Sequence, residues 1–332
     1  MKVLFVASAN KGHINAIVIN QGVSLVEEGI EVRYYGIEGK GFFGYLGNIS
    51  KLKGQIHSFE PDLIHAHFSY SGFVASLAVK KVPVVVSLMG SDLAGGGIRQ
   101  LAGGWTRCLA AFFSRFVWDI TIVKSGWMSE RTGGQRTIVI PNGVDMERFS
   151  PMCNRPALKK KHGFSAGKKH ILFFADPARY EKNFKLAQKS MEFISRDDVE
   201  LMSMHGVSPE LMPELINAAD VVLLTSRWEG SPNIVKEAMA CNCPVVATDV
   251  GDLKWLFGDE PGYYLSWPDP AEVAQNIQRA IDLREQKVVL NGRRRIMKLE
   301  LDSANIARRI IAEYVRLLKG MERPGNQTTT GQ

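Results

Sequence analysis

The chain has 332 residues and a formal net charge of +7. This length suggests two domains, and 45% hydrophobic with 23% charged residues is ordinary for a soluble globular protein. No window approaches the ~20 apolar residues of a membrane span. The positive charge suits a polyphosphate ligand or an anionic membrane surface, and the chain carries no DNA- or RNA-binding signature, so nucleic acid is not an expected partner.

The cysteines indicate a reducing compartment. The four of them show no zinc-ligand spacing, since Cys241 and Cys243 are separated by a single residue. We expect free thiols in a cytoplasmic protein. The short apolar run at the N-terminus, 1–7, is too brief for a signal peptide and predicts a buried strand.

Short apolar runs alternate with helical patterns along the chain, as in Asn15–Glu28 and Phe73–Val79. Strand-helix alternation of this kind predicts doubly wound parallel sheets, hence an α/β fold. The pattern restarts after Ser150–Lys169, a stretch rich in Pro, Lys and Gly that is typical of an exposed linker. The predicted strands are Val3–Ala7, Glu31–Tyr35, Leu63–Ala66, Val84–Leu88, Ile120–Val123, Thr137–Ile140, Ile171–Ala175, Val199–Met204, Val221–Thr225, Val245–Thr248 and Tyr263–Leu265.

The richest stretch for function is Ser226–Ala240, which follows a predicted strand. Ser231 is expected to cap a helix whose first residue is Pro232. The N–H groups at the start of that helix favour an anion, and Glu229 and Glu237 add two carboxylates that can hold sugar hydroxyls. The arrangement suits a sugar phosphate or nucleotide sugar. The alternative, with about even odds, is that both glutamates are ordinary solvent-facing acids, which helix N-termini also favour.

The whole run Glu-Gly-Ser-Pro-Asn-Ile-Val-Lys-Glu-Ala-Met-Ala from Glu229, followed by Cys243–Thr248, resembles the signature of family-4 retaining glycosyltransferases of the bacterial envelope or exopolysaccharide type. The resemblance implies the GT-B fold, with two Rossmann-like domains facing each other across a cleft. We expect an acceptor-side domain over 1–155 and a nucleotide-sugar domain over 165–303. A final helix, 304–320, returns to the first domain, and the tail 321–332 is expected to be disordered.

The resemblance also implies site roles. Glu229 would hold the donor sugar and Glu237 the nucleotide ribose, and no metal or other cofactor would be needed. Five further donor-binding positions are expected, two of them being the helix-start residues: Gly230, Ser231, Asn233, Ile234 and, on the loop after the first strand, Gly12.

Two cations follow the first strand of the second predicted domain. Ligands sit at the carboxyl ends of parallel strands, so Lys182 and Arg179 could clamp the diphosphate that leaves when a nucleotide sugar is cleaved. The alternative is that both are solvated surface cations, because most lysine and arginine side chains are exposed. Lys182 matches the family pattern well and Arg179 less closely.

Three polar residues in the first domain are candidates for contact with the reacting sugar or the acceptor. His65 and His67 end a predicted strand, and alternation places them on one face; no third ligand accompanies them to suggest a metal. The resemblance implies a catalytic histidine here, and His67 is favoured, with His65 on the acceptor side. Asp92 lies in Leu-Met-Gly-Ser-Asp, similar to a family turn that usually has His in place of Met89. It is an acceptor-side candidate, and a turn or helix-cap role is nearly as well supported.

Aromatic residues interleave with cations around residues 40–53 and 105–118. Core packing is the favoured explanation, and an interfacial surface that meets a lipid-linked acceptor at the inner face of the membrane is the alternative.

Together these features predict a retaining glycosyltransferase that moves a sugar from a UDP- or GDP-sugar to a glycan or lipid-linked acceptor. Cell-surface polysaccharide biosynthesis is the expected process. Two rivals remain: a non-catalytic sugar-nucleotide-binding protein, and a Rossmann-type enzyme that modifies nucleotide sugars. The latter would need a glycine fingerprint after the first strand, which is missing.

Overall fold

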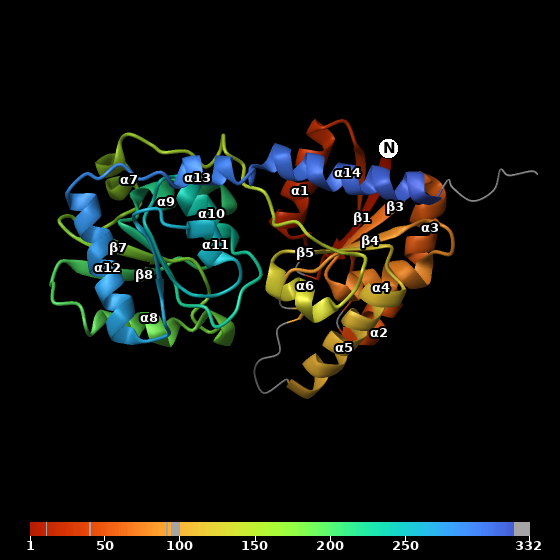
Figure 1. Cartoon of the computed structure of the whole chain (residues 1–332), viewed down its shortest axis with the longest axis horizontal. Helices are drawn as coiled ribbons and strands as arrows, with labels where there is room; N and C mark the ends of the chain where they lie inside the picture. Colours follow the sequence, from red (N-terminus) through yellow and green to blue (C-terminus); the bar gives the residue numbers. More distant parts are fainter. Residues whose placement is uncertain (11, 40, 91, 94–99, 322–332) are drawn as a thin grey trace, which may run out of the picture. The chain divides into compact units, whose positions relative to one another are not determined.

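A computed structural model describes residues 1–10, 12–39, 41–90, 92–93 and 100–321. These residues form two compact units, each built on one sheet (Figure 1). The first contains Met1–Leu93, Ala102–Pro141 and the chain from Ala304, and the second contains Asn142–Ser303 together with residues 100–101. The predicted tail, 321–332, lies outside the described residues except for Met321.

The first unit has a six-stranded sheet in the order β2-β1-β3-β4-β5-β6. Every neighbouring pair is parallel, which confirms the predicted doubly wound arrangement. Its strands are β1 (Lys2–Ser8), β2 (Glu31–Ile37), β3 (Leu63–His67), β4 (Val84–Ser87), β5 (Ile120–Val123) and β6 (Thr137–Val139). Its helices are α1 (Ala16–Glu27), α2 (Gly41–Leu46), α3 (Ile49–Phe59), α4 (Ser69–Ala78), α5 (Gln100–Phe116), α6 (Gly126–Thr132) and α14 (Ser303–Met321).

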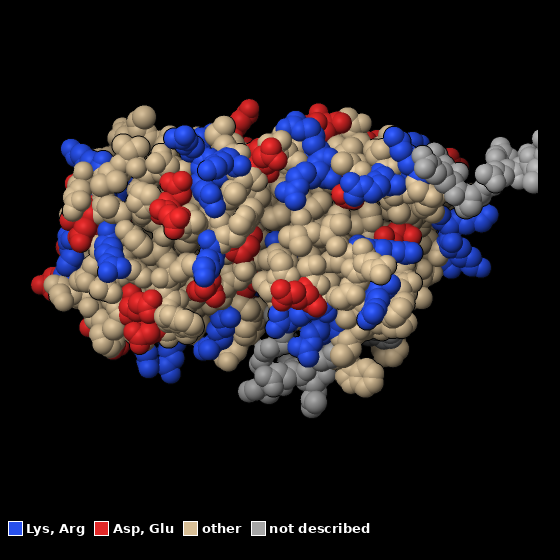
Figure 2. Space-filling model, viewed as in Figure 1, with Lys and Arg blue, Asp and Glu red and all other residues tan. Residues whose placement is uncertain are grey.

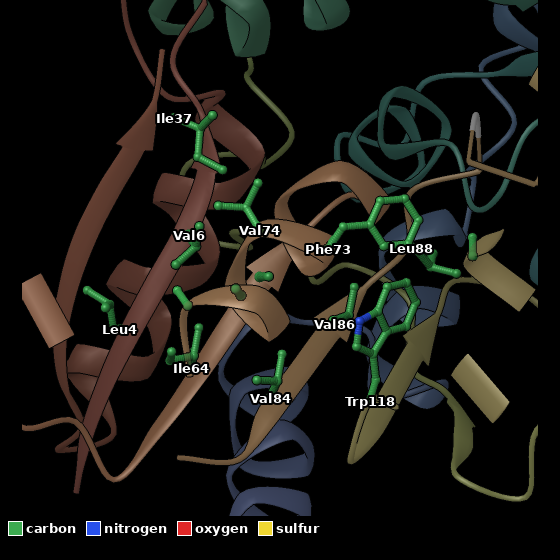
Figure 3. Close-up of a cluster of buried hydrophobic side chains, with 14 of the residues drawn as sticks. Leu4, Val6, Ile37, Ile64, Phe73, Val74, Val84, Val86, Leu88 and Trp118 are labelled. Carbon is green, nitrogen blue, oxygen red and sulfur yellow. The ribbon is translucent and has the colours of Figure 1, made fainter. Parts of the chain in front are cut away.

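Alternate residues of these strands build the core of the first unit. Leu4 and Val6 of β1 point to one face with Val86 of β4, and they pack against α4 (Figure 3). Trp118, fully buried, closes this cluster against Phe73 of α4. Gly72 permits the approach, because a Cβ there would lie 2.8 Å from the Trp118 ring.

The second unit has a five-stranded, fully parallel sheet in the order β11-β10-β9-β7-β8. Its strands are β7 (Lys169–Phe173), β8 (Val199–Ser203), β9 (Val221–Leu224), β10 (Val245–Thr248) and β11 (Tyr263–Ser266). Its helices are α7 (Arg155–Lys161), α8 (Phe184–Met191), α9 (Met212–Ala218), α10 (Asn233–Ala240), α11 (Leu253–Phe257), α12 (Pro270–Glu285) and α13 (Gly292–Lys298), with 3₁₀ turns η1 (Tyr180–Lys182) and η2 (Pro209–Leu211).

The predicted linker Ser150–Lys169 is largely exposed, as expected, but it lies within the second unit and is not an irregular connector. It contains α7, which is capped by the Asn154 side chain on the Ala157 N–H and has a proline in its first turn, where proline is favoured. Arg155 and Lys159 of α7 both pair with the buried Asp220 carboxylate, at 2.5 and 2.6 Å. The proline and lysines that suggested a loop therefore start and anchor a helix.

Residues 142–155, assigned to the first domain from the sequence, belong to the second unit. Two interactions explain the difference. The Arg293 guanidinium donates to the carbonyls of Met146 and Phe149, each at 2.7 Å, and the backbone of Val144 hydrogen-bonds Leu301 and Ser303. Gly143 is needed for close packing, since a Cβ there would lie 2.7 Å from Ser303 Cα.

The predicted return of the last helix to the first unit is confirmed. Arg308 of α14 pairs with Glu28 at the end of α1 at 3.0 Å, and Arg309 donates to the Val139 carbonyl. Figure 1 shows α14 running along this unit. Within the described part of the chain, no helix is long and apolar enough to cross a membrane.

Candidate active site

The stretch after β9 adopts the predicted strand–turn–helix form, with one correction. Helix α10 begins at Asn233, and Pro232 occupies the capping position. No side-chain cap bond forms there, so the predicted capping role of Ser231 is wrong. The reason is that the backbone turns into the helix one residue later than expected.

Lys182 and Glu229, predicted separately, form one ion pair. The Lys182 ammonium lies 2.5 Å from Glu229 Oε1, and both side chains are largely buried. The Ser226 hydroxyl donates to the same oxygen at 2.6 Å. Lys182 is held by the Thr225 hydroxyl, which donates to its carbonyl. The loops after β7 and β9 thus place a cation and a carboxylate in direct contact at the carboxyl end of this sheet.

Arg179 stands apart from that pair. Its guanidinium binds Glu181, with Nε and Nη2 at 2.7 and 2.6 Å from the carboxylate, and its side chain is 53% exposed. The structure therefore brings Lys182, but not Arg179, into contact with Glu229. A catalytic role for Arg179 stays a prediction, and its neutralised, exposed position matches the surface-cation alternative.

Glu237 and its neighbour Lys236 were not linked in the sequence prediction. Burial raises the pKa of Glu237 to about 7, opposed by the adjacent Lys236 ammonium. Burial likewise lowers the pKa of Lys236 to about 8, against the attraction of Asp252 and Glu237. The fully buried Lys236 donates to the Asn142 carbonyl at 2.6 Å. Sequence reasoning missed Lys236; a charged residue within the apolar run of α10 was the available signal.

The backbone of Glu229 and Gly230 packs against the loop after β10. Sequence reasoning also missed this loop. Gly251, on the loop after β10, has φ +67°, and a Cβ there would lie 2.5 Å from the Gly230 carbonyl oxygen. Only glycine fits this approach. Asn233 at the start of α10 accepts from the Asn142 amide at 3.4 Å, while Ile234 remains partly exposed at the helix start.

In the first unit, His65 and His67 lie on one face of β3 as predicted, with stacked rings 4.5 Å apart. His65 is hydrogen-bonded through Nδ1 to the Tyr314 hydroxyl and through Nε2 to Ser87. The ring nitrogens of the fully buried His67 meet no partner among the described residues. Burial, helped by Lys124, lowers the pKa of His67 to about 3, so its ring is neutral at physiological pH.

Lys124 is a second cation that sequence reasoning missed. It follows β5, is nearly fully buried, and lies 3.4 Å from both the Ser87 hydroxyl and the Ile140 carbonyl. Immediately after His67, Phe68 has φ +70°, a costly conformation for a bulky residue. Strain of this kind concentrates at functional positions, which supports the prediction for His67 without testing it.

Asp92 and Gly12 occupy loops of the first unit. The Asp92 carboxylate accepts from the Ser69 N–H and hydroxyl and from the Met89 N–H, all at 2.8 Å. These bonds hold the start of α4, as in the helix-cap alternative, and an acceptor contact stays a prediction. Gly12 has φ +82° and is exposed on the loop after β1, which suits close backbone approach by a ligand.

The His65–Tyr314 bond ties α14 to the sheet and can be tested by stability. Tyr314→Phe should lower the free energy of unfolding by about 1–2 kcal/mol, because it leaves a buried ring nitrogen unsatisfied. Urea titration measures the change. Tyr180→Phe, at an exposed tyrosine, is the matched control and should have no effect. Equal stabilities for both variants would contradict the anchoring role.

No cluster of three or more His, Cys, Asp or Glu side chains with metal-site geometry occurs in the described ranges.

Comparisons with known proteins agree with this geometry. The family profile described as Glycosyltransferase Family 4 matches residues 4–148, and that described as Glycosyl transferases group 1 matches residues 169–282. The first match lies mainly in the first unit and the second match lies in the second unit, and together they contain every site residue predicted from the sequence.

Curated relatives are distant. TuaC of Bacillus subtilis is named as a teichuronic acid biosynthesis glycosyltransferase. It is 26% identical to this chain over 243 residues, which cover 66% of this chain and 61% of the relative. An Escherichia coli protein named UDP-Gal:alpha-D-GlcNAc-diphosphoundecaprenol alpha-1,3-galactosyltransferase is 26% identical over 235 residues, 60% of each chain. The matches span about three fifths of the length of these relatives.

Solved structures share the fold. Sucrose-phosphate synthase from Thermosynechococcus elongatus superposes with a TM-score of 0.78 at 17% identity, covering 96% of this chain and all of that one. HepE of Anabaena, solved with UDP and glucose, gives 0.77 at 18% identity and covers 95% and 100%. Two parallel Rossmann-like units with a returning final helix define the GT-B class of protein. Within that class, this chain belongs to the family-4, or group 1, glycosyltransferases.

Proposed function

We propose that this protein is a retaining glycosyltransferase that moves a sugar from a UDP- or GDP-sugar to a glycan or lipid-linked acceptor in cell-surface polysaccharide biosynthesis. The observation that carries the proposal is the Lys182–Glu229 ion pair beside the start of α10. The names of the relatives support the process. Because HepE was solved with UDP and the E. coli relative's name gives a UDP-sugar donor, UDP-sugars are the first donors to test. The transfer reaction would take place in the cytoplasm, at the inner face of the membrane.

In this proposal the sugar–phosphate bond breaks while the acceptor hydroxyl attacks the same face of the anomeric carbon. The acceptor proton passes to the departing phosphate oxygen. Negative charge grows on the diphosphate, where the Lys182 ammonium and the N–H groups of Asn233 and Ile234 stabilise it. Glu229 holds the sugar hydroxyls and Glu237 the ribose. His67, neutral, offers a hydrogen bond to the transferred sugar.

Incubation with radiolabelled UDP- and GDP-sugars tests the proposal. We expect slow hydrolysis of one donor without NAD, and transfer with retained anomeric configuration when an acceptor is supplied. Nucleotide binding without turnover of any donor would indicate the non-catalytic alternative. Turnover that depends on NAD and leaves the sugar–phosphate bond intact would indicate a nucleotide-sugar-modifying enzyme.

Metal independence is part of the proposal, because Lys182 and the start of α10 supply the positive charge that a cation would otherwise provide. We expect donor hydrolysis to keep its rate in EDTA at a large excess over trace metal. Activity lost in EDTA and restored by Mg²⁺ or Mn²⁺ would show that a metal is required. The same assay on Lys182→Ala, with and without Mg²⁺, serves as the control.

A further inference from the structure

A fully buried lysine precedes Glu237 in α10. On the visible face of the molecule, lysine and arginine side chains are interspersed with acidic ones (Figure 2), whereas Lys236 has no exposed surface. Its neighbours Val235, Ala238 and Met239 are buried and apolar. Burying a charge costs free energy, and an apolar side chain of similar volume often stabilises a fold as well or better. Stability alone therefore does not account for a lysine at this position.

The carbonyl that binds this ammonium is itself held in place. Asn142 begins the second unit, and its carbonyl accepts from the buried ammonium at 2.6 Å. The Asn142 amide donates to the Asn233 side chain at the start of α10 at 3.4 Å. Two residues further on, Val144 exchanges backbone hydrogen bonds with Leu301 and Ser303, each at 2.9 Å. The ammonium is thus tied to a part of the backbone that is fixed on both sides.

Two carboxyl groups act on the same ammonium. Burial lowers the pKa of Lys236 to about 8, and the charges of Asp252 and Glu237 oppose this change. Asp252 lies on the loop after β10, and Glu237 is the next residue of α10. Burial raises the pKa of Glu237 to about 7, and the Lys236 ammonium and then Arg148 oppose that change. The lysine charge therefore favours the ionised form of Glu237 near neutral pH.

Other charged and titratable groups approach this part of α10 from the elements packed around it. They are Cys241 at the end of α10, Glu214 of α9 and Arg293 of α13. Burial raises the pKa of the Cys241 thiol to about 12, so the thiol is uncharged. Glu214 pairs with Lys161 of α7, and Arg293 donates to backbone carbonyls of the segment 146–149. Among the described residues, Asp252 and Arg148 are thus the charged groups outside α10 that act on the pair.

We propose that Lys236 is a positioning residue for donor binding: Asn142 and Asp252 hold its buried ammonium in place, and its charge keeps Glu237 as the carboxylate that accepts hydrogen bonds from the ribose. The proposal rests on the proposed function, which assigns Glu237 to the nucleotide. An ionised carboxylate only accepts hydrogen bonds, and it binds hydroxyl donors more strongly than a protonated carboxyl does. Lys236 itself contacts no part of the donor, because its ammonium is bonded to the Asn142 carbonyl.

Calorimetric titration of the full chain with UDP, or with GDP if that is the nucleotide it binds, tests the proposal. Lys236→Gln keeps a donor for the Asn142 carbonyl and removes the charge. The pH at which affinity rises should therefore move up by about one unit from its wild-type value near 7. The variant should bind about fivefold more weakly than the wild type at about pH 7 and equally well at about pH 9. Its preference for the nucleotide over the 2′-deoxy form should also shrink at neutral pH.

Lys254→Gln, the same substitution at an exposed lysine of α11, is the matched control and should follow the wild-type pH profile. Lys236→Met removes both charge and donor and should show the same shift of the profile, with melting temperatures to confirm that each variant folds. A loss of affinity by one factor at every pH, or equal losses for the nucleotide and its 2′-deoxy form, would indicate packing alone and overturn the proposal.

The wild type separates this inference from the proposed function. Wild-type nucleotide binding with unshifted profiles in both Lys236 variants would contradict the role of Lys236 alone. A wild-type protein that binds neither UDP nor GDP would contradict the proposed function, and the role of Lys236 with it.

Discussion

Replacing Lys182 by alanine is expected to lower kcat for donor cleavage by about a hundredfold or more, a loss typical of one oxyanion donor. The ammonium would bind the departing diphosphate more tightly in the transition state, when negative charge peaks, than in the ground state. Interactions that strengthen in the transition state raise turnover and not only affinity. Steady-state kinetics with the preferred donor measure the effect. A variant that raises only KM would show that Lys182 is a uniform binding contact.

Variants at and near Lys182 serve as controls for the Lys182→Ala experiment. Lys185→Ala, at an exposed lysine of α8, should keep full activity. Arg179→Ala should cost much less than Lys182→Ala, because Glu181 already neutralises that guanidinium. Lys182→Gln should rescue little, since it keeps a donor but loses the charge. The double variant with Glu229→Gln should be non-additive, because the two side chains are 2.5 Å apart.

Replacing Glu237 by alanine is expected to weaken binding of the nucleoside diphosphate by ~1.5–3 kcal/mol, the range for hydrogen bonds to a charged group. Isothermal titration calorimetry with UDP and GDP measures it. Because the pKa of Glu237 is raised to about 7, only part of the protein carries the ionised carboxylate at neutral pH. Wild-type affinity should therefore rise as pH increases through 7. Glu237→Gln should lose this dependence, and an unchanged affinity in a folded alanine variant would contradict the ribose role.

The same pKa predicts the pH dependence of stability. Between the ordinary glutamate value of 4.5 and about 7, the folded state holds the Glu237 proton that the unfolded state has lost. The free energy of unfolding should therefore fall as pH rises through this window, and Glu237→Gln should reduce the fall. Lys236 acts in the opposite direction at higher pH. Its lowered pKa, about 8, makes stability rise between 8 and its ordinary value of 10.5.

Sequence alone determined the strands, their parallel arrangement and the β9–α10 turn that carries Glu229 and Glu237. These features are local: a buried strand is a short apolar run, and a helix start is marked by a few consecutive residues. It also placed Lys182 after β7, because the carboxyl ends of parallel strands share one edge of a sheet. The one-residue error at Pro232 is the usual uncertainty of a helix boundary.

Tertiary structure alone decided which of those residues meet. Lys182 contacts Glu229 across 47 positions, and Tyr314 reaches His65 across 249. The buried Lys236 ammonium donates a hydrogen bond to the carbonyl of Asn142, 94 residues away in the sequence. Such pairs depend on strand order and on how helices pack, which no local pattern encodes. The same holds for α5, where aromatic residues occur on both faces of the helix. Only the packing of Phe113 against Phe73 shows which face is the core, and therefore which face meets the solvent.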